Sequence, residues 1–206
     1  MEDLKRNILI SGFMLFFICA QGQSQPAIQA AFGRSYEAEQ AGNYGKAIAE
    51  LKSVYKADNY FSNIRLGWLY YLDKQNTTSL QYYNLAISLK PYAIEAKFGC
   101  VKPLSALGSW DKVKEQYYLI LKIDPHNTVA NYWLGVIYYN RKDYQNAVKL
   151  FERVVNLYPL DYDSIIMLAW TKLQLGSFTD ARVLFNQALI IRPNDSSAMS
   201  GLKQLK

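Results

Sequence analysis

The sequence contains only two cysteines and one histidine among its 206 residues. A metal centre of Cys and His ligands needs several of these residues at short spacings, and no such cluster occurs. The single histidine, His126, falls in a predicted surface turn, and one histidine with one buried cysteine, Cys100, cannot supply a nucleophile, a base and an orienting group. A glycine-rich phosphate loop is also missing. We therefore expect no catalytic site, no metal and no cofactor.

Charged residues are also few, at 19% of the chain, and they carry a net charge of +6. The Lys and Arg residues are scattered, with no run of four or more, whereas a nucleic-acid-binding protein concentrates them in a patch or stripe. We expect no nucleic-acid partner. Hydrophobic residues reach 50% and aromatic residues 15%, which is typical of a globular chain and not of a disordered one.

The first 20 residues have the layout of a secretory signal peptide. Lys5 and Arg6 precede an apolar run, Ile8 to Ile18, and small and polar residues follow it. This run of 11 residues is too short for a membrane-spanning helix, which needs about 20. We place the cleavage site after Ala20, with Gly22 as a second choice. The protein is therefore expected to be exported, and to be periplasmic or associated with the cell envelope.

Two other interpretations of this segment stay open. An uncleaved segment would serve as an N-terminal anchor. A bacterial lipoprotein signal would place a lipid on Cys19, although the bulky Ile18 stands where such signals carry a small residue. Cleavage leaves Cys100 as the single cysteine, which excludes an internal disulfide. Its place in the helical pattern below predicts an inert, buried side chain.

Prolines recur with a period of 34 residues, at Pro91, Pro125, Pro159 and Pro193. Each closes a similar apolar phrase, such as LAISLKP or ALIIRP. Proline ends a helix because it lacks an N–H group and crowds the preceding turn. Between the prolines the pattern is helix, turn, helix, as in ANYWLGVIYYNRKDYQNAVKLFERVVNLYP.

This pattern resembles the tetratricopeptide repeat family, whose 34-residue signature has Leu-Gly and Tyr in the first helix, then Ala and Phe in the second. In the stretch quoted above these residues are Leu134, Gly135, Tyr138, Ala147 and Phe151. The resemblance implies an all-α fold, a right-handed superhelical solenoid of helix-turn-helix units with a C-terminal capping helix.

The resemblance covers nearly all of the chain beyond the signal peptide. The expected ranges are 1–20 for the signal peptide, 21–27 for a linker, 28–59, 60–93, 94–127, 128–161 and 162–195 for five repeats, and 196–206 for the capping helix. The first repeat is the least typical, as terminal units of solenoids usually are, because one face has no neighbour. Pro103 falls inside the first helix of the third repeat, where we expect a kink.

The first helix of each repeat carries two apolar stripes. Because a helix turns about 100° per residue, repeat positions 4, 7, 8 and 11 share one face and positions 2, 5, 9 and 12 share another. The resemblance implies that the first face packs on neighbouring helices and the second lines a concave groove. Eight of the fifteen residues at positions 5, 9 and 12 are aromatic. We call the predicted partner-binding residues the groove stripe: Phe32, Tyr36, Ile64, Trp68, Tyr71, Phe98, Lys102, Tyr132, Val136, Tyr139, Ile166 and Trp170.

Large apolar patches mark binding sites, and Trp and Tyr are favoured anchors. We therefore expect a scaffold or adaptor of the periplasm or envelope that binds an apolar or aromatic segment of another protein, as a peptide or a helix. Three alternatives stay open: a structural homo-oligomer using the groove or the solenoid ends, rings that pack on one another without a partner, and a glycan binder. Membrane contact is expected only through the envelope setting or a lipid on Cys19.

Overall fold

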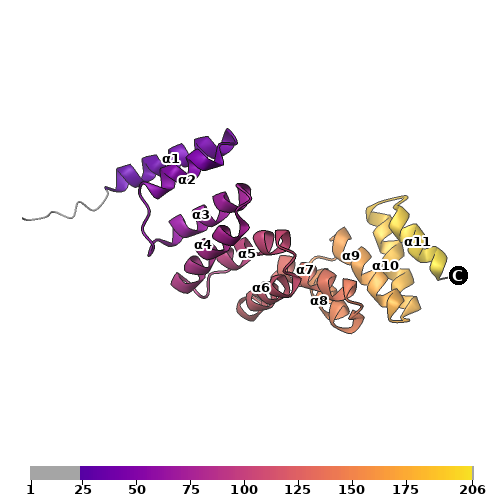
Figure 1. The fold of residues 1–206 in the computed structure, drawn as a ribbon. Helices are drawn as coiled ribbons and strands as arrows, with labels where there is room; N and C mark the ends of the chain where they lie inside the picture. Colours follow the sequence, from indigo (N-terminus) through magenta and orange to yellow (C-terminus); the bar gives the residue numbers. More distant parts are fainter. Residues whose placement is uncertain (1–23, 206) are drawn as a thin grey trace, which may run out of the picture.

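The computed structural model describes residues 24–205, and these form eleven α-helices and no strand (Figure 1). The signal-peptide prediction and Cys19 lie outside the described residues. The helices are α1 (Gln25–Gln40), α2 (Tyr44–Lys52), α3 (Tyr60–Leu72), α4 (Asn76–Leu89), α5 (Glu95–Ala106), α6 (Trp110–Ile123), α7 (Thr128–Asn140), α8 (Tyr144–Leu157), α9 (Tyr162–Gln174), α10 (Phe178–Ile191) and α11 (Ser196–Gln204). Among the described residues no helix combines the length and apolar character that a membrane span requires.

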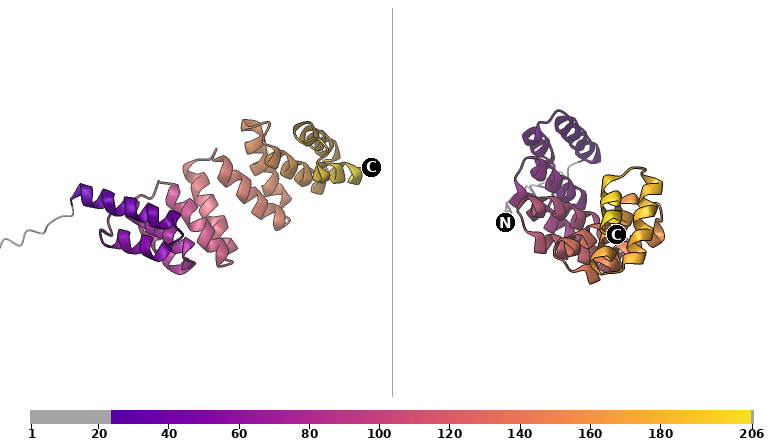
Figure 2. Two further views of the ribbon diagram at one scale, coloured as in Figure 1. Left: turned by 90° about the horizontal axis from the view of Figure 1, so that it is seen from above. Right: turned by 90° about the vertical axis from the view of Figure 1, so that its right-hand side faces the viewer.

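The helices pack in consecutive pairs, from α1 with α2 to α9 with α10, and α11 packs on α9 and α10. Each pair contacts the next, and the first helices of successive pairs also meet, as α3 does with α5 and α7 with α9. The pairs follow one another along the molecule (Figure 1), and the view along its length shows an open curve (Figure 2). The fold is a superhelical solenoid.

One boundary differs from the sequence prediction. Helix α1 begins at Gln25, so residues 25–27 are helical although they were predicted to belong to a linker. Pro26 lies in the first turn of this helix, where the missing N–H group has no intrahelical partner to lose. The proline therefore marks the start of the helix and not a segment before it.

Local signals fix most helix starts. Six helices begin behind an Asn or Asp side chain that accepts a hydrogen bond from the backbone N–H three residues later, which satisfies one free donor of the first turn. These caps are Asn43, Asn59, Asn127, Asp143, Asp161 and Asp195. The turn inside each pair contains one residue with positive φ, namely Gly42, Lys74, Gly108, Lys142 and Gly176.

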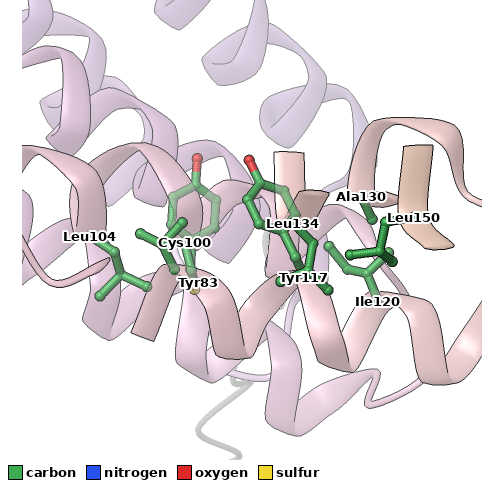
Figure 3. Close-up of a cluster of buried hydrophobic side chains, with 9 residues drawn as sticks. Tyr83, Cys100, Leu104, Tyr117, Ile120, Ala130, Leu134 and Leu150 are labelled. Atoms are coloured by element: carbon green, nitrogen blue, oxygen red, sulfur yellow. The ribbon is translucent and has the colours of Figure 1, made fainter. Parts of the chain in front are cut away.

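The core combines small residues on one helix with large ones on its neighbour. Ala147 and Ala181, where the helices of a pair meet, are fully buried, as are the large residues Phe151 and Phe185 one turn later. A cluster that includes Tyr83, Cys100, Tyr117, Leu134 and Leu150 runs from α4 to α8 and joins three pairs (Figure 3). Burial raises the pKa of the Cys100 thiol to about 12, so the thiol stays neutral.

Helix α5 continues through Pro103, which is buried. A proline ring crowds the carbonyl group four residues earlier, and that residue is Gly99. Gly99 also faces the ring of Tyr83 from the preceding pair so closely that a Cβ atom would overlap it. The segment of α5 that contains Pro103 therefore approaches α4 closely, because Gly99 has no side chain.

Polar residues at repeat position 4 hold the turns between pairs. The Nδ2 group of Asn131 donates hydrogen bonds to the carbonyls of Pro125 (3.0 Å) and Asn127 (2.9 Å), and Asn63 makes the equivalent bonds two pairs earlier. The ammonium group of Lys97 bonds to the carbonyls of the turn before α5. The family signature did not predict these bonds, which connect the first helix of a pair to the turn before it.

Candidate functional site

The groove stripe lies on α1, α3, α5, α7 and α9, the first helices of the five pairs. Its members differ in exposure. Tyr36 and Lys102 are exposed, and Ile166 is buried with 8% of its surface accessible. The remaining nine are half-buried: Phe32, Ile64, Trp68, Tyr71, Phe98, Tyr132, Val136, Tyr139 and Trp170. The stripe is therefore less open than its composition suggested.

In the N-terminal half, rings and cations of the stripe form one connected surface across α1, α3 and α5. The guanidinium carbon of Arg65 lies 3.9 Å from the centre of the Tyr36 ring. The ammonium group of Lys102 lies 4.7 Å from the centre of the Trp68 ring and 5.8 Å from that of Tyr71. We call these five residues the cation–aromatic cluster. Such contacts stabilise by roughly 0.5–1 kcal/mol at exposed sites.

Glu39 links two members of this cluster, Arg65 and Trp68. Its carboxylate accepts a hydrogen bond from Nε1 of Trp68 at 2.6 Å and forms an ion pair with Arg65. The side chain of Arg65 is 9% exposed and that of Glu39 is 21% exposed. The polar atom of the Trp68 ring is thus used inside the protein, which fixes the ring in place and leaves its face for other contacts.

In the C-terminal half the stripe packs on the protein's own core. Tyr132 meets Phe151 edge to face at 6.0 Å, and Trp170 meets Phe185 in the same way at 5.2 Å. Nε1 of Trp170 donates to Oγ of Ser197, at 2.9 Å. These contacts tie each ring to the second helix of its own pair, and they tie Trp170 also to α11.

A hollow of about 770 Å³ lies outside the groove stripe except for Tyr132. It is formed by the start of α7, the end of α8 and the turn before α9. Five of its lining residues are large, apolar and exposed: Val129, Trp133, Leu157, Tyr158 and Leu160. Two carboxylates, Asp161 and Asp163, also line it.

The hollow was missed because Trp133 belongs to neither stripe and because the rest of its wall comes from a turn. The turn sequence carried a signal. LYPLD has Leu and Tyr where the turns IDPHN and IRPND have polar residues. Loops are usually polar, so apolar residues at the tip of a turn point to a contact.

A second hollow of about 320 Å³ lies between α6 and α8. Tyr118 and Tyr138 contribute rings to it, and Lys122, Lys149 and Arg153 give it a basic rim. The two hollows therefore differ in charge.

Among residues 24–205 there is no group of His, Cys, Asp and Glu side chains placed to hold a metal ion. His126 is exposed in its turn, and Cys100 is the buried, neutral thiol described above. The surfaces that stand out are the cation–aromatic cluster and the two hollows, and each is suited to binding.

Residues 140–205 and 115–162 each match a family model described as tetratricopeptide repeat. The chain is a tetratricopeptide repeat protein. Such repeats generally act as non-enzymatic scaffolds for protein–protein interaction, and the fold described above supports that role for this chain. No curated protein matches the sequence.

Solved structures share the fold. A tetratricopeptide repeat protein from Parabacteroides merdae superimposes with a TM-score of 0.73 at 19% identity, covering 87% of this chain and 72% of that one. A MamA protein gives 0.69 at 16% identity, covering 82% and 93%. MamA from Desulfovibrio magneticus gives 0.68 at 14% identity, covering 82% and 98%. At these identities the likeness concerns the fold alone.

Proposed function

We propose that this tetratricopeptide repeat protein is a scaffold of the periplasm or cell envelope that binds an apolar or aromatic segment of another protein along its groove stripe. The observation that carries this proposal is the cation–aromatic cluster. It combines rings and cations from three successive pairs into one surface, and Tyr36 and Lys102 within it are exposed.

Aromatic rings and arginine are the residues most often found at the energetic centres of protein interfaces. The Trp68 ring is held by Glu39, so binding a partner orders few further side-chain rotors. The two exposed members of the groove stripe, Tyr36 and Lys102, lie on α1 and α5, so we place the main contact of the partner on α1, α3 and α5.

Site-specific photo-cross-linking tests this proposal. A photoreactive phenylalanine replaces Tyr36 in one full-length variant and Phe178 on α10 in another, and both are expressed in the source cells. Phe178 is a matched control because the two rings have similar exposure, 49% for Tyr36 and 58% for Phe178, and Phe178 lines neither hollow. We expect a defined partner to cross-link at Tyr36 and not at Phe178.

The charge change Lys102→Glu should weaken that cross-link, because it replaces the cation that lies over Trp68. Equal cross-linking at both positions would contradict the proposal that the partner binds along the groove stripe. Cross-links only between copies of the chain would favour the homo-oligomer instead. The proposed export is tested separately by the mass of the protein recovered from the envelope, which should correspond to a chain beginning at Gln21.

A further inference from the structure

The hollow between α7, α8 and the turn before α9 has an unusual combination of walls. Leu160 is 75% exposed, Tyr158 58% and Val129 52%. Trp133 is 47% exposed, and its ring meets Tyr132 edge to face with the centres 5.2 Å apart. Exposed apolar residues on this scale, gathered around one concavity, are typical of a binding site.

The charge of the hollow is opposite in sign to the net charge of the chain. The chain has a net charge of +6, yet the described residues that line the hollow include two carboxylates and no Lys or Arg. Asp161 caps α9 by accepting a hydrogen bond from the N–H of Ser164 at 3.0 Å. Asp163 lies 3.8 Å from Arg192, a loose ion pair in which both side chains are more than half exposed.

Both carboxylates line the hollow together with Tyr132. Burial raises the pKa of Tyr132, and the negative charges of Asp163 and Asp161 raise it further. Tyr132 is therefore a neutral ring close to two carboxylates. A ligand that enters this space meets aromatic faces, aliphatic walls and negative charge together.

We propose that this hollow binds an arginine or lysine side chain of a partner protein together with an apolar residue next to it. The aliphatic stem of such a side chain packs on Val129 and Leu157, its charged head meets the rings of Trp133 and Tyr158, and Asp161 and Asp163 complement the charge. The volume, about 770 Å³, is within the range of roughly 300–1,000 Å³ typical of ligand sites and exceeds what one side chain fills.

This inference rests on the proposed function in one respect, because it assumes a protein partner. It does not rest on the cation–aromatic cluster. The cation–aromatic cluster lies on α1, α3 and α5, whereas the hollow lies on α7, α8 and α9. A partner long enough to contact both would be held at two separated points.

Nuclear magnetic resonance of the tryptophan indole groups in the full-length protein tests the inference. The probes are two capped tripeptides, Leu-Arg-Leu and Leu-citrulline-Leu, which have nearly the same shape but differ by one positive charge. We expect the Trp133 indole signal to shift with the arginine peptide, and the citrulline peptide to bind at least five-fold more weakly. The double change Asp161→Asn, Asp163→Asn should weaken arginine-peptide binding about ten-fold, and Asn at position 161 still caps α9.

Trp133→Ala and Trp110→Ala form a matched pair, because Trp110 is 54% exposed and does not line the hollow. Binding of the arginine peptide, measured by isothermal titration calorimetry because the first variant lacks the Trp133 signal, should be lost in the first variant and kept in the second. Three outcomes overturn the inference: equal affinity for both peptides, binding unchanged by Trp133→Ala, and a mass that falls from dimer to monomer on Trp133→Ala. The last would show a second copy of the chain in the hollow.

The two proposals fail separately. A shift of the Trp133 signal with the arginine peptide, but no partner cross-linked at Tyr36, would support binding in the hollow and contradict binding along the groove stripe. A partner cross-linked at Tyr36, with no shift of Trp133 at millimolar arginine peptide, would do the reverse.

Discussion

The ring of Phe151 lies directly against Gly135, so that a Cβ atom on this glycine would be 2.8 Å from Cε1 of the ring. The two residues come from the two helices of one pair, α7 and α8, and both are buried. Gly67 and Tyr83 have the same relationship in the pair formed by α3 and α4. The glycine of the Leu-Gly motif is thus needed for space, because the large residue of the second helix occupies the position of its side chain.

Gly135→Ala should lower stability by about 1–2 kcal/mol. The added methyl group overpacks a fully buried ring, at about 1–3 kcal/mol, and the better helix propensity of Ala returns at most about 1 kcal/mol. Gly33→Ala is the control, since Gly33 lies in α1 with no atom within 4 Å of the added carbon. It should stabilise the protein slightly. Thermal unfolding followed by circular dichroism separates the two, and equal effects would contradict the steric explanation.

Asn131→Ile should cost about 1–2 kcal/mol, because the carbonyl of Pro125 loses its donor. The last pair shows how an apolar residue is accommodated at this position. There Ile165 takes the place of the Asn, and Nε2 of Gln187 donates to the carbonyl of Pro159 at 2.8 Å.

Arg153 is the residue equivalent to Gln187, 34 residues earlier. Adding Arg153→Gln to Asn131→Ile should therefore recover at least half of the lost stability. Chemical denaturation of the single and double variants measures this difference. A double variant as unstable as the single one would show that the hydrogen bond to the turn is not what Asn131 contributes.

Glu39→Leu should destabilise by about 2–3 kcal/mol, because it leaves the nearly buried Arg65 without its counter-ion and Trp68 without its acceptor. The double change Glu39→Leu, Arg65→Met should be more stable than the single change, since it removes the unpaired charge. Arg34→Met serves as the control. It breaks an exposed ion pair with Glu50 and should cost less than about 1 kcal/mol. Additive losses in the double variant would rule out the buried pair as the cause.

Cys100 should resist alkylation in the folded protein. Burial raises its thiol pKa from 9.0 to about 12, so almost no thiolate is present at about pH 8. In a Cys19→Ser background, reaction with iodoacetamide should be at least a hundred-fold slower in buffer than in denaturant. The same shift makes stability depend on pH. The contribution of the protonated thiol is complete below pH 9 and is lost as the pH rises towards 12. Rapid alkylation of the native protein would mean that the cluster around α5 opens readily.

Much of this fold can be predicted from the sequence, because the residues that pack within each repeat recur at fixed positions. The period of the prolines, the Leu-Gly pairs and the Ala and Phe residues of the second helices all describe contacts within one pair or with its neighbour. Ala147, Ala181, Phe151 and Phe185 are buried as that pattern requires. Such contacts depend on local spacing, which a sequence shows directly.

The exposure of the groove stripe could not be read in the same way. Helical arithmetic assigns Ile166 and Tyr36 to one face, yet 8% of the first and 49% of the second is accessible. Ile166 is buried in a core cluster formed by α9, α10 and α11, whereas the Tyr36 ring on α1 contacts Arg65 at the surface of the solenoid. The hollow was hidden for a similar reason, because its walls come from two pairs and the turn between them.

The contacts of this chain run from each pair to the next, and among the described residues no helix packs on one far away in the sequence. Under tension such a molecule behaves as a soft coil. A small change of angle at every junction adds up to a large change in the distance between its ends, without breaking any single interface. A partner bound at both the cation–aromatic cluster and the hollow would fix the distance between these two surfaces. Binding would therefore make the part of the solenoid between them stiffer.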